Sequence, residues 1–344
     1  MSEIKIGSRL VGDGHPCLIS LEPGATHTGL ESAKALTKAA AESGADAIKF
    51  QTMTTEKLMA TRDTQIEYDT VQGTKKESVY EAMKRRELTP NEWKELKKYT
   101  DELGLLFISA PSDKETVDLL VEMDVAAIKV AKSDINYFPL VDYIARQGKP
   151  VILDGRERFE DVQKCVEICE SHGCTNILIM HCPSGYPSKH AGVHLSAIPH
   201  IKGLFKYPVG YSDHSVGTNM NYAALALGAS LIEKTITLDR GTDAVEHYMS
   251  LEPGELADFV TNLREVESAL GDPRIIFSSR VNPELRRSIF AGRLISRGEV
   301  IQIEDLDFRR PGIHLSVSSY QDVIGKQVNK DLNQGDPILL SDIE

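Results

Sequence analysis

Acidic, cationic and histidine side chains gather in one stretch of the sequence, Lys206–Thr235. Its first apolar segment, Tyr207–Tyr211, is predicted to be a strand that delivers Ser212, Asp213 and His214 at its end. The side chains of these three residues can accept or donate protons, hold sugar hydroxyls or ligate a metal. The stretch therefore predicts a chemical site where this strand ends.

A second apolar run in the same stretch, Leu231–Ile236, is also predicted to be a buried strand, and it carries Glu233 and Lys234. Charges in an apolar run are costly unless they are paired or used. A helix capped by Asp213 or Ser215 is expected between the two strands. Carboxyl ends of parallel strands share one crevice, so this βαβ unit offers an acid and a cation to the same site.

The alternation of apolar strand and helix recurs through most of the chain. Eight strands over about 250 residues predict an α/β fold of the (β/α)8 TIM-barrel type. No GxGxxG follows a strand, which weakens the rival open doubly wound sheet. The predicted strands are Cys17–Leu21, Ala47–Gln51, Leu105–Ala110, Ala126–Ala131, Pro150–Asp154, Ile177–Cys182, Tyr207–Tyr211 and Leu231–Ile236.

The two ends of the chain differ from this pattern. Ile4–Ile6 and Arg9–Val11 are predicted to form an N-terminal β-hairpin. After Gly271 the segments become short, β-like and punctuated by RG, RPG and QG turns. We therefore expect a barrel domain over residues 1–273, a linker over 274–287 and a small β-rich domain over 288–344. The charge-rich stretches at 75–86 and 155–161 are interpreted as solvated helix faces.

The composition of the chain indicates which classes of binding partner and which cell compartment to expect. The formal net charge of −12 argues against nucleic acid or an anionic membrane as a general partner. No apolar run approaches the roughly 20 residues of a spanning helix, and the start MSEIKIG lacks a signal-peptide core. Five cysteines without a CxxC pair favour buried reduced thiols. These features predict a cytoplasmic protein.

Several motifs in a fixed order carry a family resemblance. They are GADAIKFQT, HCPSGYPS, VGYSDHS and HYMSLEPGEL, followed by RRSIFAGRLISRGEVI, FRRPG and VIGKQV. Together they resemble the sialic acid synthase family nearly end to end, and the tail is similar to its antifreeze-like (SAF) domain. The resemblance implies condensation of phosphoenolpyruvate with an N-acyl mannosamine-type sugar and water. The products would be phosphate and a nine-carbon 2-keto-3-deoxy acid of nonulosonic acid biosynthesis.

The resemblance also implies roles for individual residues. Glu22 would hold sugar hydroxyls or handle a proton, and Lys49 and Lys129 would bind the carboxylate and phosphate of the donor. Glu233 would contact the open-chain sugar. The expected catalytic residues are Glu22, Lys129 and Glu233, and the expected substrate-binding residues are Lys49, Gln51, Lys132, Ser133, Tyr186, Ser212, Asp213, Glu246 and Arg310.

Two further implications concern the assembly and the metal. The family forms a dimer in which the small domain of one subunit covers the barrel mouth of the other, so Arg310 would reach the acyl group of the sugar in the partner subunit. His214 would ligate a divalent metal, Mn²⁺ or Mg²⁺. Thr235 stands where the family has a second metal histidine. The metal is therefore weak or absent, or Glu246 or His247 takes the vacant place.

Other readings of the same residues stay open at this point. Glu22 and Glu233 could belong to salt bridges of the barrel core with Lys49 or Lys129. The donor side also departs from the family, with Ala110, Lys132 or Ser133, and Asp154 where small hydroxyl residues are expected. The barrel could instead run a metal-free aldolase or lyase step through a Schiff-base lysine, or be a retired sugar-binding homologue. The candidate Schiff-base lysines are Lys129, Lys132 and Lys234.

Overall fold

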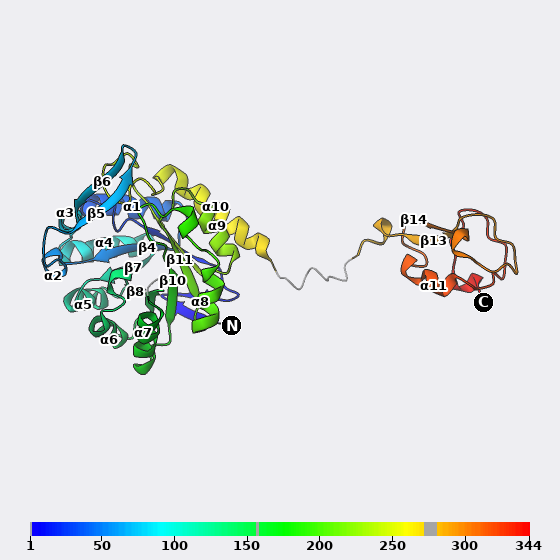
Figure 1. Cartoon of the computed structure of the whole chain (residues 1–344), viewed down its shortest axis with the longest axis horizontal. Helices are drawn as coiled ribbons and strands as arrows, with labels where there is room; N and C mark the ends of the chain where they lie inside the picture. The colour runs from blue at the N-terminus through cyan, green and yellow to red at the C-terminus, as the bar shows by residue number, and fades with distance from the viewer. Residues whose placement is uncertain (1, 156–157, 272–280) are drawn as a thin grey trace. The chain divides into compact units, whose positions relative to one another are not determined.

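The computed structural model describes residues 2–155, 158–271 and 281–344, and it divides into two compact units, Met1–Gly271 and Asp272–Glu344. The first unit is a closed barrel of parallel strands surrounded by helices (Figure 1), as the sequence predicted. The strands follow chain order around the barrel, and the last pairs with the first. They are β3 (Leu18–Glu22), β4 (Ala47–Thr52), β7 (Leu106–Pro111), β8 (Ala127–Val130), β9 (Val151–Asp154), β10 (Ile177–His181), β11 (Val209–Asp213) and β12 (Leu231–Thr235).

Helices cover the outside of the barrel because each presents an apolar face to the strands. The local sequence sets these helices, as the start of α4 shows. Thr89 accepts a hydrogen bond from the N–H of Glu92 at 3.3 Å, and Pro90 opens the helix. Trp93 then lies 1% exposed in the core. The helices are α1 (Leu30–Glu42), α4 (Pro90–Glu102), α5 (Lys114–Glu122), α6 (Phe138–Ala145), α7 (Phe159–Ser171), α8 (Ala197–Phe205), α9 (Asn219–Ala226) and α10 (Pro253–Leu270).

The predicted N-terminal hairpin is present as β1 (Glu3–Ile6) and β2 (Arg9–Gly12), paired antiparallel. Its buried residues Ile4, Ile6 and Val11 form a second apolar cluster with residues from the first half of the barrel strands. The hairpin thus closes the amino-terminal end of the barrel. Polar side chains inside the barrel are left to the opposite end, where the carboxyl ends of the strands meet.

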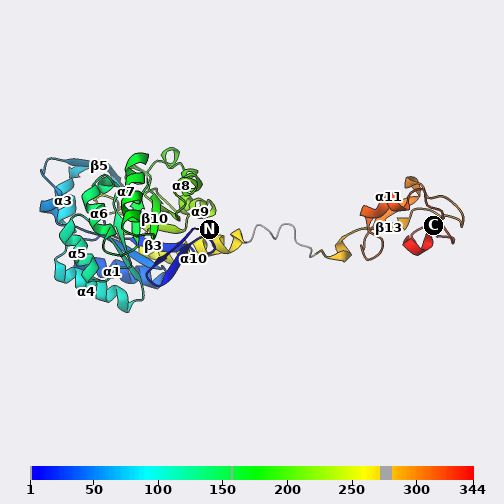
Figure 2. The ribbon, with the colours of Figure 1, turned by 90° about the horizontal axis from the view of Figure 1, so that it is seen from below.

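A second hairpin, which the sequence did not reveal, lies in the excursion between β4 and β7. It consists of β5 (Gln65–Thr70) and β6 (Gly73–Ser78), flanked by α2 (Thr55–Leu58) and α3 (Val79–Lys84). In both views of the barrel unit this hairpin lies on the side away from the N-terminus (Figures 1 and 2). The N–H of Asp69 donates to the carbonyl of Tyr186 at 2.9 Å. The hairpin is therefore joined to the loop that follows β10, at the carboxyl end of the barrel.

The second unit has a small apolar core of its own, which includes Ile289, Ile301 and Val323. It contains β13 (Ser288–Ala291) and β14 (Leu306–Arg309), paired antiparallel, and the short helix α11 (Tyr320–Val323). This agrees with the small β-rich C-terminal domain expected from the sequence. The predicted linker, 274–287, begins within 272–280, which lies outside the described residues.

Two sequence expectations concern membranes and thiols. None of the helices in the described part of the chain has the length and apolar character needed to cross a membrane. The cysteines Cys17, Cys165, Cys169, Cys174 and Cys182 are all free and buried, as the composition predicted.

Candidate active site

A pocket of about 430 Å³ opens where the barrel strands end. It brings together residues that are up to 224 positions apart in the chain, from Glu22 to Glu246. Every barrel residue predicted for the site lines it, with the single exception of Asp213. The predicted residues in its wall are Glu22, Lys49, Gln51, Lys129, Lys132, Ser133, Tyr186, Ser212, His214, Glu233 and Glu246.

One charged group in the pocket is built on β3 and β4. Glu22 is the last residue of β3, and its Oε1 accepts hydrogen bonds from Nζ of Lys49 and, at 3.1 Å, from Nε2 of Gln51. The side chains of Glu22 and Lys49 are 3% and 5% exposed. Such a buried pair satisfies both charges before any ligand arrives, and it holds the ammonium in a fixed place.

A second charged group is built on β8, β11 and β12. Glu233 Oε1 accepts hydrogen bonds from Nζ of Lys129 at 2.6 Å and from Oγ of Ser212 at 2.7 Å. Ser212 and Glu233 are register partners on neighbouring strands, so the pairing of the sheet itself brings them together. Nζ of Lys49 lies 3.9 Å from the same carboxylate oxygen. Two cations therefore share Glu233.

Charge pairing fixes the protonation of this cluster. Burial alone raises the pKa of Glu233, but Lys129 and Lys49 outweigh it and hold the pKa well below its ordinary value. Burial alone lowers the pKa of Lys129, but the Glu233 and Glu22 carboxylates outweigh it and raise the pKa. At neutral pH Glu233 is thus ionised and Lys129 is protonated.

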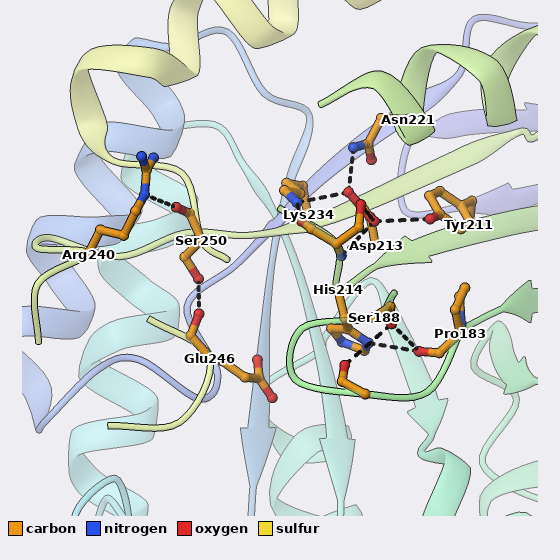
Figure 3. Close-up of polar contacts among 12 residues, drawn as sticks. Pro183, Ser188, Tyr211, Asp213, His214, Asn221, Lys234, Arg240, Glu246 and Ser250 are labelled. Atoms are coloured by element: carbon orange, nitrogen blue, oxygen red, sulfur yellow. Dashed lines mark hydrogen bonds and ion pairs between the residues drawn. The ribbon is translucent and has the colours of Figure 1, made fainter. Parts of the chain in front are cut away.

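Asp213 faces the outside of the barrel, because side chains alternate along a strand. Its carboxylate accepts from Nζ of Lys234 at 2.8 Å, from Nδ2 of Asn221 in α9 at 2.7 Å and from the Tyr211 hydroxyl at 3.0 Å (Figure 3). It also accepts from the N–H of Ser215 at 2.9 Å. The predicted helix cap is wrong: Thr218 is the N-cap of α9, and no side chain caps that helix.

Three residues on loops complete one side of the pocket. The rings of Tyr186 and His214 lie with their centroids 5.2 Å apart. His214 Nδ1 is 3.3 Å from the carbonyl oxygen of Pro183 (Figure 3). Glu246 has φ of 70°, a left-handed conformation that is costly for a residue with a side chain. Its carbonyl accepts a hydrogen bond from Ser250 at 2.7 Å, which holds this backbone in place. Burial raises the pKa of the Glu246 carboxyl group.

The residues at the expected metal position do not fit the divalent metal of the family. A metal-binding imidazole must be neutral. Burial alone lowers the pKa of His214, but Cys182, Glu246 and Glu22 outweigh it and raise the pKa to about 10. Thr235 Oγ1 is buried without a hydrogen-bond partner among the described residues. Across 2–155, 158–271 and 281–344, no three His, Cys, Asp or Glu side chains are grouped as metal ligands would be.

The sequence interpretation missed Arg86, which follows α3. The stretch that contains it was expected to be a solvated helix face, but Arg86 is 7% exposed and lines the pocket. Apolar residues from the β5–β6 hairpin and α3 lie in the same wall, among them Ile66, Val79 and Met83. Arg310 belongs to the second unit, directly after β14, and its predicted part in the site stays a prediction.

An eight-stranded parallel barrel with a charged pocket at the carboxyl ends of its strands is the (β/α)8-barrel architecture, with the pocket at the end where the active sites of such barrels lie. Residues 36–274 match the model of the NeuB family, and residues 286–344 match that of the SAF domain. The chain belongs to the NeuB family. The sequence resemblance to sialic acid synthases is thereby confirmed.

Individual relatives extend over nearly the whole chain. An uncharacterized protein of Methanocaldococcus jannaschii is 38% identical over 348 residues, covering 100% of this chain and 99% of the relative. N,N'-diacetyllegionaminic acid synthase of Campylobacter jejuni is 33% identical over 93% of this chain and 98% of its own length. The crystal structure of the N-acetylneuraminic acid synthetase of Leptospira borgpetersenii superposes with a TM-score of 0.70 at 30% identity, covering 83% of this chain and 93% of that one.

Proposed function

We propose that the protein condenses phosphoenolpyruvate with an N-acyl mannosamine-type sugar to give a nine-carbon 2-keto-3-deoxy acid, in nonulosonic acid biosynthesis. The observation that carries the proposal is the pair of lysines in the pocket, Lys49 and Lys129, each bound to a buried carboxylate. Fixed ammonium groups at a barrel mouth suit a donor that carries both a carboxylate and a phosphate.

The reaction joins C3 of phosphoenolpyruvate to the aldehyde carbon of the open-chain sugar, and the aldehyde oxygen becomes a hydroxyl. Water then adds to C2 of the donor, and phosphate leaves with the oxygen that bridged C2 and phosphorus. Lys49 and Lys129 bind the donor and keep its negative charge in place through both steps. Glu233 fixes both ammonium groups and faces the sugar, while Glu22 holds a sugar hydroxyl or takes the proton of the attacking water.

The remaining pocket residues are assigned by their position. Lys132 and Gln51 extend the polar wall beside these charges, and the Tyr186 ring lines the acceptor side. Glu246 is placed to accept hydrogen bonds from sugar hydroxyls. A dimer in which Arg310 of one copy reaches the pocket of the other is part of the proposal, and it rests on the family resemblance.

The surroundings of Lys129 and Lys234 argue against the Schiff-base alternative. An amine that attacks a carbonyl must be neutral and must be reachable by the substrate. Glu233 keeps Lys129 protonated, and the Lys234 side chain is fully buried in its pair with Asp213. Lys132 is the remaining candidate, and borohydride treatment in the presence of pyruvate tests it by the mass of the protein.

The proposed function is tested by incubating the protein with phosphoenolpyruvate and a panel of N-acyl mannosamine-type sugars. We expect one phosphate released for each sugar consumed, and a product whose mass equals sugar plus pyruvate. Glu22→Gln keeps the shape of the side chain and serves as a matched variant that should abolish most of this turnover. Sugar binding without phosphate release across the panel, with and without Mn²⁺, would instead identify a catalytically inactive homologue that binds sugars.

A separate prediction concerns the metal position. Removing a residue that hydrogen-bonds to a metal ligand lowers metal affinity about 10- to 100-fold. The absence of a ligand itself, at Thr235, should lower the affinity at least as much. We expect the chelated wild-type protein to retain little Mn²⁺ in equilibrium dialysis, and Thr235→His to bind about one equivalent with at least about tenfold higher affinity. Thr235→Leu is the control without a donor atom. Tight stoichiometric Mn²⁺ binding by the wild type would show that the site holds the metal without a second histidine.

A further inference from the structure

Arg86 is a buried cation that the proposed condensation does not use. Its backbone N–H donates to the Met83 carbonyl at 3.1 Å, which fixes the residue at the end of α3 and turns its side chain into the pocket wall. Its neighbour Arg85 behaves differently, because its guanidinium forms two hydrogen bonds to Glu77 at 2.8 and 3.0 Å. Two successive arginines therefore have opposite environments, one paired and one buried in the pocket.

The Arg86 guanidinium lacks a counter-ion within the described part of the chain. Its Nε is buried without a hydrogen-bond partner there, and no carboxylate of a described residue lies within ion-pair distance. Burial lowers the pKa of Arg86, yet an arginine stays charged at neutral pH. Burying a charge without a partner destabilises the folded protein. A ligand that brings an anion would remove this cost.

The charges in the pocket indicate which of the two substrates, donor or acceptor, would bring this anion. Lys49 and Lys129 already have buried carboxylate partners and face the donor in the proposed function. The charges that act most on the pKa of Arg86 are those of Glu246, then of Glu22, which also pairs with Lys49, and of Tyr186. Tyr186 and Glu246 are the residues assigned to the acceptor. The unpaired guanidinium thus lies on the acceptor side, next to a carboxylate suited to sugar hydroxyls.

We propose that Arg86 binds an anionic substituent of the acceptor, so that the sugar condensed by this protein carries a phosphate or a carboxylate. This inference rests on the proposed function and narrows its substrate class. The planar guanidinium fork suits either anion, since both present two oxygens to paired N–H groups. The apolar residues Ile66, Val79 and Met83 beside it exclude water and strengthen the interaction.

The test compares three acceptors on the full-length protein: N-acetylmannosamine, its 6-phosphate and the corresponding 6-carboxylate. We expect wild type to prefer one of the anionic sugars. Arg86→Met should lower kcat/KM for that sugar about 10- to 100-fold and leave the neutral sugar within about twofold. Arg86→Lys keeps the charge and loses the planar guanidinium, so its kcat/KM for the anionic sugar should lie between those of wild type and Arg86→Met. Arg85→Met is the matched control and should behave as wild type.

Calorimetric binding of the same sugars separates this inference from the proposed function. Anionic-sugar binding that Arg86→Met abolishes, without any phosphate release, would uphold the anion site and refute the condensation. Condensation of the anionic sugars at the same kcat/KM in wild type and Arg86→Met would refute the anion site alone. A rise confined to the KM for phosphoenolpyruvate would assign Arg86 to the donor and also contradict the inference. A large fall in melting temperature in both Arg86 variants would also contradict the inference, since it would show that Arg86 stabilises the fold.

Discussion

Phosphate release from phosphoenolpyruvate is expected to fall about 100- to 1000-fold when Lys129 is replaced by methionine. The substitution removes an ammonium group that is fixed 2.6 Å from Glu233 and faces the pocket. Methionine has a similar length and no charge, so the change isolates electrostatics from packing. Because bound donor and departing phosphate both need this charge, we expect the loss in kcat and in kcat/KM. Steady-state phosphate release measures both.

Lys149→Met is the matched control for this result. Lys149 lies just before β9, at the closed end of the barrel, and pairs with Asp124 at the surface. It should change kcat/KM by less than about twofold, since surface substitutions away from a site are usually small in effect. Turnover by Lys129→Met close to that of the control would show that the donor binds elsewhere.

Lys234→Met is expected to lower the free energy of unfolding of the barrel by about 3–5 kcal/mol, because it leaves Asp213 as a buried charge without its cation. Both side chains of this pair are 0% exposed. The Lys234 ammonium also donates to the Ser215 carbonyl at 2.6 Å, so the loop after β11 loses support as well. The effect on stability should therefore exceed that of any single surface ion pair.

Trp93 provides the measurement, because it is the single tryptophan of the chain and lies in the barrel core. Its fluorescence during urea unfolding reports on the barrel unit. Lys98→Met removes an exposed lysine whose ion pair with Glu102 spans 3.9 Å, and it should cost less than about 1 kcal/mol. A Lys234→Met midpoint equal to that of Lys98→Met would mean that Asp213 is stabilised by its hydrogen bonds alone.

Much of the barrel followed from the sequence because each strand is a short apolar run that ends in polar residues. β12 shows the reason: Leu231 and Ile232 are buried, and Glu233 then appears where the strand reaches the open end. The β5–β6 hairpin could not be found in this way. Its sequence is mostly polar, and it is held by contacts of Ile66 and Tyr68 with residues far away in the chain. Pairing of that kind leaves no local periodic signal.

The candidate site was predictable where it depends on strand ends, and it was missed where it depends on alternation or on distant packing. Ser212 and Asp213 are neighbours in sequence, but a strand sends them to opposite faces, so only Ser212 reaches the pocket. Arg86 lies in a charge-rich segment that is typical of a solvated helix face. Arg86 is nevertheless buried, and it lines the pocket together with Ile66 of the β5–β6 hairpin.

The fate of the bridging oxygen of phosphoenolpyruvate tests the central claim most directly. With ¹⁸O between C2 and phosphorus, the condensation at Lys49, Lys129 and Glu233 predicts that the label is recovered in inorganic phosphate. The new acid then takes its C2 oxygen from water. Label retained on pyruvate, with the sugar unconsumed, would mean that the pocket only hydrolyses the phosphate ester, and it would contradict the account.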